Sequence, residues 1–269
     1  MEIKKKNSSL IYTLAVILTV TLLASCTKNN IDDRTVSLPV VQSYLIAGQP
    51  IVIKLYQQKL VTDTAVYGAA ITGIKLYLSN GSKQVQLTES PLGTYTYSDP
   101  TFLVAGKTYN MQFAYLGYNV SANTVMPGKP ANFISQYTNV NIPTTNTLPG
   151  IAPPILNVLA WSNPDSLYHV IEFKGINTIV AIRNFGDPPA NFEVNAGQAP
   201  YYNITGNIFS YYGTYQVVLL RVNQEYINWL KNSSRTSSQN LTQSYTNITN
   251  GFGIFTAMQA DTLSLNVNY

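Results

Sequence analysis

Side chains able to do acid–base, nucleophilic or metal chemistry are scarce in this sequence. Among its 269 residues are one histidine, His169, and one cysteine, Cys26, and the carboxylates are few and scattered. Hydrolytic and metal sites need several such side chains converging on one point. The sequence also has no Gly-x-Ser-x-Gly elbow, phosphate-binding loop or dinucleotide fingerprint. We therefore expect no enzyme activity, no catalytic residue, no metal site and no cofactor.

His169 alternates with Ile171 and Phe173 along an apolar run. In a strand, residues two apart share a face, so this pattern places the imidazole beside core side chains. No second histidine exists to join it as a metal ligand. We expect a half-buried histidine with satisfied ring nitrogens.

Cys26 closes a segment with the features of an export signal. Lys4, Lys5 and Lys6 precede an apolar run from Leu10 to Leu23, which is too short for the roughly 20 residues of a spanning helix. The segment Leu22-Leu23-Ala24-Ser25-Cys26 resembles the lipobox of bacterial lipoproteins. That resemblance implies a signal peptide at residues 1–25, cleavage before Cys26, and acylation of its thiol. The alternative is an ordinary secretory signal with a chance cysteine.

The charge balance argues against a nucleic-acid partner. The formal net charge is +4. Residues 1–25 carry three lysines and one glutamate, so without them the charge is 13 − 11 = +2. Phosphate binding needs clustered Lys and Arg, which a nearly neutral chain does not supply. A single cysteine also forms no internal disulfide, so packing and hydrogen bonds must stabilise the fold.

Short alternating runs separated by turn residues predict a mostly β fold with two β-sandwich-like domains. After a flexible tether at residues 26–37, the first sandwich is expected at 38–127. It includes a hairpin at Asn80-Gly81, with positive φ at both central residues, and a strand that buries Tyr109, Met111 and Phe113. A proline-rich connection at 128–154, outside the sheet cores, leads to a second β-rich domain at 155–269. Its strands are expected at 155–161, 168–174, 178–183, 214–222, 251–255 and 263–267, and its one short helix at 223–231, with Asn223 as N-cap.

Twenty tyrosines give the chain an aromatic, amide-rich character. Tyr201, Tyr202, Tyr211 and Tyr212 lie in the segment 195–215, which lacks a clear strand pattern and is expected to be loop-like. Aromatic faces stack on sugars and peptides while neighbouring amides hydrogen-bond to them. We hypothesise that these four tyrosines line an exposed surface for a glycan, a peptide or a protein partner. The alternative is that they fill half-buried strand positions, which tyrosine also favours.

The order of several short motifs is similar to a family of outer-membrane lipoproteins of Bacteroidetes-type bacteria, domain of unknown function 4249. The motifs, which span nearly the whole chain after the signal, are Val40 to Ile46, Gly68-Ala69, Gly93-Thr94-Tyr95, Gly106-Lys107-Thr108-Tyr109, Ser121-Ala122, Met126-Pro127, Trp161-Ser162-Asn163-Pro164, Glu225-Tyr226, Asn247-Ile248 and Gly253-Ile254-Phe255. The tyrosine-rich stretch at 201–215 departs from the family pattern. The first half also resembles the transthyretin-like or carboxypeptidase-regulatory-like sandwich.

The family resemblance implies a lipid-anchored protein of the outer membrane, exposed on the cell surface. It implies association with a TonB-dependent receptor in uptake, as an accessory component that binds a ligand or docks on the receptor. Asp32-Asp33 loosely resembles an acidic signal for surface exposure, although a solvated linker has the same composition. The alternative function is a structural or adhesion spacer of the outer membrane with no small ligand.

The first testable prediction concerns Cys26. Replacing Cys26 by Ser should prevent acylation, so the mass that the acyl groups add should be missing. The protein should also leave the membrane fraction, since acyl chains provide the attachment. Fractionation and intact-mass measurement of both proteins check this. A Cys26→Ser protein that remains in the membrane fraction at unchanged mass would contradict the prediction.

Overall fold

The computed structural model describes residues 38–59, 64–142, 152–182, 188–233 and 245–269. This part of the chain is mostly β with several sheets and one helix, which confirms the expected fold class. Residues 38–269 form one compact unit. Within the described ranges, no helix is long and apolar enough to cross a membrane. The signal peptide, Cys26 and the tether lie outside the described residues.

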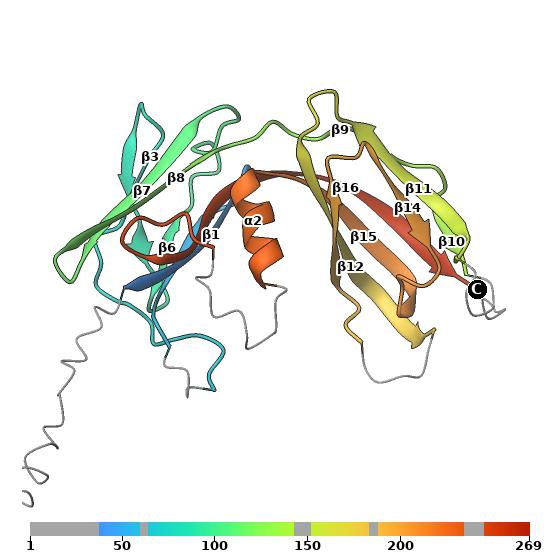
Figure 1. Ribbon diagram of the computed structural model, residues 1–269, viewed down its shortest axis with the longest axis horizontal. Helices are drawn as coiled ribbons and strands as arrows, with labels where there is room; N and C mark the ends of the chain where they lie inside the picture. Colours follow the sequence, from blue (N-terminus) through green and yellow to red (C-terminus); the bar gives the residue numbers. More distant parts are fainter. Residues whose placement is uncertain (1–37, 60–63, 143–151, 183–187, 234–244) are drawn as a thin grey trace, which may run out of the picture. The chain divides into compact units, whose positions relative to one another are not determined.

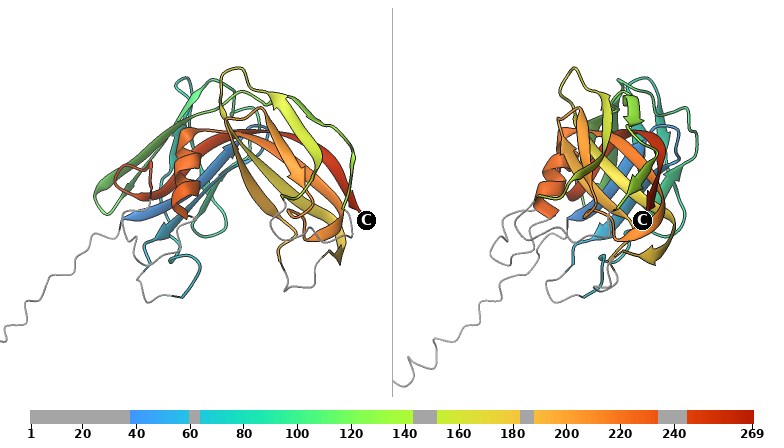
Figure 2. Two further views of the ribbon diagram at one scale, coloured as in Figure 1. Left: turned by 45° about the vertical axis from the view of Figure 1, so that its right-hand side comes forward. Right: turned by 90° about the vertical axis from the view of Figure 1, so that its right-hand side faces the viewer.

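Sheet A, the largest of three sheets, is organised by β16 (Phe252–Asn268) (Figure 1). The first half of β16 pairs in parallel with β1 (Pro39–Ile46), and its second half pairs antiparallel with β15 (Tyr211–Val222). In the views of Figure 2 the red β16 runs alongside the blue β1 and the orange β15. Beyond β1 the sheet continues with β2 (Ile51–Gln57), β6 (Thr94–Tyr97) and β5 (Thr88–Glu89). Beyond β15 it continues with β12 (Tyr168–Ala181) and β13 (Phe192–Gly197). In addition, β10 (Asn139–Asn141) pairs with the end of β16.

Two smaller sheets pack on sheet A. Sheet B has the order β4 (Gln84–Gln86), β3 (Tyr77–Ser79), β7 (Thr108–Tyr115) and β8 (Tyr118–Val125), and sheet C has the order β14 (Tyr201–Thr205), β11 (Ile155–Ser162) and β9 (Ala131–Ser135). Alternation buries every second side chain along most of β7, β8 and β11. In β7 the predicted inward face is confirmed, because Tyr109, Met111 and Phe113 are all buried.

Each smaller sheet encloses its own core against sheet A. Odd-numbered residues of β16 enter both cores: Phe255 and Ala257 lie in the core with sheet B, and Leu265 and Val267 in the core with sheet C. These residues share one face of β16 because they are an even number of positions apart. The two cores therefore share the strand β16.

The helix α2 (Gln224–Ser233) packs on the opposite face of sheet A. Its Tyr226 and Ile227 form a third core with even-numbered Ile254 and Met258 of β16 and with Leu220 of β15. The predicted helix is thus confirmed, and it begins at Gln224. Burial of one apolar face against the sheet supplies most of the stability of so short a helix.

A hydrogen-bond cluster around Thr124 of β8 fixes the start of α2. The Thr124 hydroxyl donates to Glu225 Oε1 at 2.6 Å and accepts from Asn223 Nδ2 at 3.0 Å and from the Ala257 backbone N–H at 3.1 Å. The Asn223 carbonyl accepts from the first helical amides, as an N-cap carbonyl does. Its side-chain amide, however, donates to Thr124 and to the Val125 carbonyl at 2.8 Å, so it joins the helix to β8.

In two places, two strands that were predicted separately form one continuous strand in the structure. The strands expected at 168–174 and 178–183 are one strand, β12, with irregular pairing near Gly175 and Thr178; residue 183 lies outside the described part. The strands expected at 251–255 and 263–267 are both in β16. Polar residues interrupt each sequence pattern, but hydrogen bonds to β15 and β1 hold the backbone extended through them.

The connection at 128–154 was expected outside the sheet cores, and this expectation is wrong for its described residues up to 142. They contain β9 and β10, and Val140 of β10 is fully buried in the core beneath sheet C. The parallel pairing of β10 with the end of β16 carries Val140 inward, and prolines flank this strand without interrupting it.

The hairpin at Asn80-Gly81 is confirmed as the link between β3 and β4, but its turn differs from the expected one. Only Gly81 has a positive φ, of 85°. Asn80 lies before the turn, and its Oδ1 accepts hydrogen bonds from the amides of Ser82 and Lys83. The asparagine side chain thus stabilises the turn from outside it.

The Thr124 cluster yields a stability prediction. Thr124→Val keeps the shape of the side chain but leaves Glu225, Asn223 and the Ala257 amide each without one partner. Because Thr124 is 3% exposed, we expect a loss of about 2 kcal/mol in the free energy of unfolding. Urea denaturation measures it. Thr108→Val, the same change at an exposed position of β7, is the control and should alter stability by less than about 0.5 kcal/mol; equal effects would contradict the role assigned to Thr124.

Candidate functional site

The four tyrosines hypothesised to form a surface lie in strands rather than in a loop. Tyr201 and Tyr202 begin β14, and Tyr211 and Tyr212 begin β15, in a different sheet. Tyr202 and Tyr212 pack against the core beneath sheet C, and the described residues include no ring contact between the two pairs. Burial raises the pKa of Tyr202. The expectation of a loop is therefore wrong, because tyrosines without a period-two pattern still fit pleated, half-buried positions.

Tyr201 is the most exposed of the four, at 51%, and lies on the outer face of sheet C. The pairing register places Tyr201 of β14 beside Ala160 of β11, and Ala160 beside Ile134 of β9. Ile134 is 60% exposed. We call this row of Tyr201, Ala160 and Ile134 the sheet C face. It presents an aromatic ring and an aliphatic side chain to solvent from neighbouring strands of a single sheet.

A hollow of about 610 Å³ lies where β9 ends. Side chains of neutral chemistry line it: Gln136, Tyr137, Thr138, Asn139, Asn141 and Leu156. The backbone here is held by Asn157, which is 1% exposed and whose Nδ2 donates to Ser135 Oγ and the Tyr137 carbonyl. Amides, a hydroxyl and one ring offer hydrogen bonds and a stacking surface to a neutral ligand.

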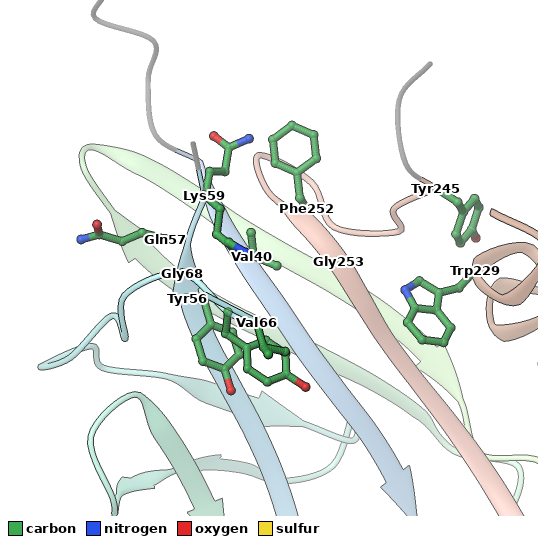
Figure 3. A pocket seen from close by; sticks show the side chains of 12 residues that line it. Val40, Tyr56, Gln57, Lys59, Val66, Gly68, Trp229, Tyr245, Phe252 and Gly253 are labelled. Atoms are coloured by element: carbon green, nitrogen blue, oxygen red, sulfur yellow. The ribbon is translucent and has the colours of Figure 1, made fainter. Parts of the chain in front are cut away.

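A second hollow, of about 440 Å³, is lined largely by aromatic and apolar side chains (Figure 3). We call it the aromatic groove, and its principal lining residues are Val40, Tyr56, Tyr67, Trp229, Tyr245 and Phe252. The rings of Tyr56 and Tyr67 stack with centroids 4.8 Å apart. Figure 3 shows Trp229 of α2 next to Tyr245, across the groove from Tyr56. Because β1, β2, β16, α2 and two loops supply these residues, no local sequence pattern marks the groove.

His169 is fully buried and only one of its ring nitrogens has a partner, so the expectation of a half-buried histidine with satisfied ring nitrogens is wrong. Nδ1 lies 3.0 Å from the Leu167 carbonyl, which must accept, so the neutral ring carries its proton on Nδ1. Nε2 is buried without a partner, as are Trp161 Nε1 and Arg221 Nε. The rings of Trp161 and His169 are 5.4 Å apart, and Arg221 is the cross-strand neighbour of His169. Burial, together with the charge of Arg221, lowers the pKa of His169 to about 4.

Two carboxylates, Glu172 and Glu193, face each other across β12 and β13, and the Tyr226 hydroxyl donates to Glu193. No group of three or more His, Cys, Asp or Glu residues in the described ranges is placed to hold a metal ion. Two surfaces of this part of the chain have a chemistry suited to neutral ligands or apolar partners: the sheet C face with its adjoining hollow, and the aromatic groove.

The His169 environment predicts a pH dependence of stability. The folded-state pKa of about 4 lies below the ordinary value of 6.5, so the folded state binds fewer protons than the unfolded state between these values. Stability is full above pH 6.5 and falls as the pH approaches 4, by at most about 3 kcal/mol. His169→Asn retains a nitrogen that can donate to Leu167 but removes the titration, so it should lose this slope.

Urea denaturation of both proteins at several pH values between 7 and 4 measures the difference. Burial raises the pKa of Glu193, which favours the folded state at low pH, and this contribution cancels because both proteins contain it. Parallel stability profiles for the two proteins would contradict the prediction.

Comparison with known proteins agrees with the resemblance inferred from the motifs. The family model described as Domain of unknown function (DUF4249) matches residues 28–264. No curated protein matches the sequence. The matched range begins just after Cys26 and includes the sheet C face, the aromatic groove and the buried histidine. The chain therefore belongs to the DUF4249 family.

Proposed function

We propose that the protein is a lipid-anchored lipoprotein of the outer membrane, exposed on the cell surface, which serves as an accessory binding component of a TonB-dependent uptake receptor. The observation that carries the proposal is the segment Leu22-Leu23-Ala24-Ser25-Cys26 at the end of a basic and apolar leader. Acylation of Cys26 would hold the folded unit at the membrane through several acyl chains, which exceeds the two signals needed for stable attachment.

The sheet C face is the proposed binding surface for a glycan, a peptide or the receptor. Tyr201 and Ile134 offer exposed apolar area from neighbouring strands, and the adjoining hollow offers amides and a hydroxyl. The strands beneath them hold these side chains in place, so binding would order few groups and cost little entropy. Of the four hypothesised tyrosines, Tyr201 supplies the accessible ring, while Tyr202 and Tyr212 support the surface from the core side.

The sandwich of the first half, whose core is completed by Phe255 and Ala257 of β16, is proposed to be transthyretin-like or carboxypeptidase-regulatory-like. In that role it would carry the second core and its binding surface away from the anchor. A spacer or adhesion protein without a ligand would share this architecture, and the two functions differ in whether the sheet C face captures a partner.

The binding prediction uses a double variant of that face. Tyr201→Ala with Ile134→Ala should lower co-purification of the TonB-dependent receptor by about tenfold, because losing an aromatic anchor at an interface costs about 1–2 kcal/mol. Mild detergent extraction, affinity capture and mass spectrometry measure it. Leu92→Ala with Val104→Ala removes two exposed apolar side chains elsewhere and is the control.

Both variants should keep the wild-type melting temperature, since all four positions are exposed. If the receptor never co-purifies with the wild-type protein, the spacer function is favoured. If both variants lose the receptor equally, the sheet C face is not the binding surface.

A further inference from the structure

The rim of the aromatic groove is both exposed and nearly uncharged. Val66 is 82% exposed and Tyr67 is 52% exposed, although both side chains are apolar or aromatic. Among the described residues that line the groove, Lys59 is the one cation and there is no carboxylate. Exposed apolar surface of this kind marks a site of contact with a partner or a membrane.

The groove lies where the chain enters the folded unit. Leu38 is the first described residue, and its backbone N–H donates to Gln58 Oε1 at 3.1 Å, while Gln58 and Val40 both line the groove. Leu38 is 38 − 26 = 12 residues from Cys26. A chain of that length spans at most about 43 Å when fully extended. If Cys26 is anchored in a bilayer, Leu38 is covalently held within that distance of it, and the groove begins beside Leu38, at Gln58 and Val40.

The side chains of the groove are those that favour the boundary between water and lipid. Tyrosine and tryptophan have an apolar body and one polar group, so they concentrate at the level of lipid headgroups. Tyr56, Tyr67, Tyr245 and Trp229 supply four such rings, and Phe252 and Val66 add apolar area. A single lysine without an opposing carboxylate is also compatible with the headgroup region.

We propose that the rim of the aromatic groove rests on the interfacial region of the lipid bilayer in which Cys26 is anchored. The inference depends on the proposed acylation of Cys26. Tethering within a few tens of ångströms raises the effective concentration of the surface to the millimolar range, so a weak affinity for lipid suffices to keep the rim engaged. The contact then orients the folded unit on the membrane, with the groove toward lipid.

The two tryptophans give a direct test with an internal control. Trp229 lies in the groove, and Trp161 is 5% exposed in the core beneath sheet C. The full-length acylated protein is purified from membranes as Trp161→Phe and Trp229→Phe variants, and each is reconstituted into phosphatidylcholine vesicles with brominated acyl chains. We expect the bromines to reduce the emission of Trp229 and to leave that of Trp161 unchanged, relative to unbrominated vesicles.

A labelling experiment provides a measurement that does not alter either tryptophan. With Cys26 acylated, Val66→Cys introduces the single free thiol, and Ile134→Cys does the same at an exposed position of the sheet C face. An environment-sensitive nitrobenzoxadiazole dye at position 66 should shift to shorter wavelength and brighten on protein-free vesicles. The same dye at position 134 should remain in a water-like environment.

The outcomes separate this inference from the proposed function. If the protein floats with the vesicles but Trp229 and Trp161 behave alike, or both dyes remain in water, the groove does not contact lipid and the inference is overturned while the anchor stands. If a dye at position 66 is shielded only in membranes that contain the receptor, the rim binds protein and the inference is again overturned. If the protein does not float with the vesicles, acylation fails and both proposals fall together.

Discussion

The pairing of β16 is the constraint on which the rest of the structure depends. One uninterrupted strand of 17 residues pairs with β1 in parallel and with β15 antiparallel, so it joins strands that are far apart in the sequence. Its alternation sends odd-numbered side chains into both sandwich cores and even-numbered ones toward α2. A shift of one residue in its register would exchange these faces and expose all three cores at once.

In this fold, buried side-chain hydroxyls and amides hold loops to the cores by hydrogen bonds, a role that disulfides have in many other domains. The Tyr95 hydroxyl is buried and donates to the Ile71 carbonyl, and that of Tyr109 donates to the Phe102 carbonyl, so each ring fills the core while its oxygen satisfies a loop. Asn157 does the same for the segment after β9. Tyr95, Tyr109 and Asn157 therefore have a structural role, since buried loops need partners for their backbone groups.

Several elements of the fold could be predicted from local sequence patterns alone. The β7 strand, the hairpin at Asn80-Gly81 and the helix α2 followed from alternation, turn residues and helical spacing. Two short strands, β9 and β10, did not, because their backbone is extended by partners on β11 and β16 rather than by their own composition. The joining of predicted strands into β12 and β16 has the same origin, and here long-range pairing overrides local preference.

The candidate binding surfaces likewise combine residues that the sequence could single out with residues that only long-range pairing brings together. Tyr201 could be singled out from composition, but its partners Ala160 and Ile134 are known only from the register of sheet C. The aromatic groove draws on residues from 40 to 253, and the unpartnered nitrogens of Trp161, His169 and Arg221 come from three strands. Sites built across sheets in this way have no motif to detect.

The parallel pairing of β1 with β16 has a consequence for how the protein is made. The strand that begins the folded unit, β1, pairs along one edge with β2 and along the other with β16, more than 200 residues later. Until that partner has left the ribosome, neither core can close, and contacts of such long sequence separation form slowly. The topology alone therefore keeps the strands made before β16 from closing their cores, whatever their individual preference for β structure.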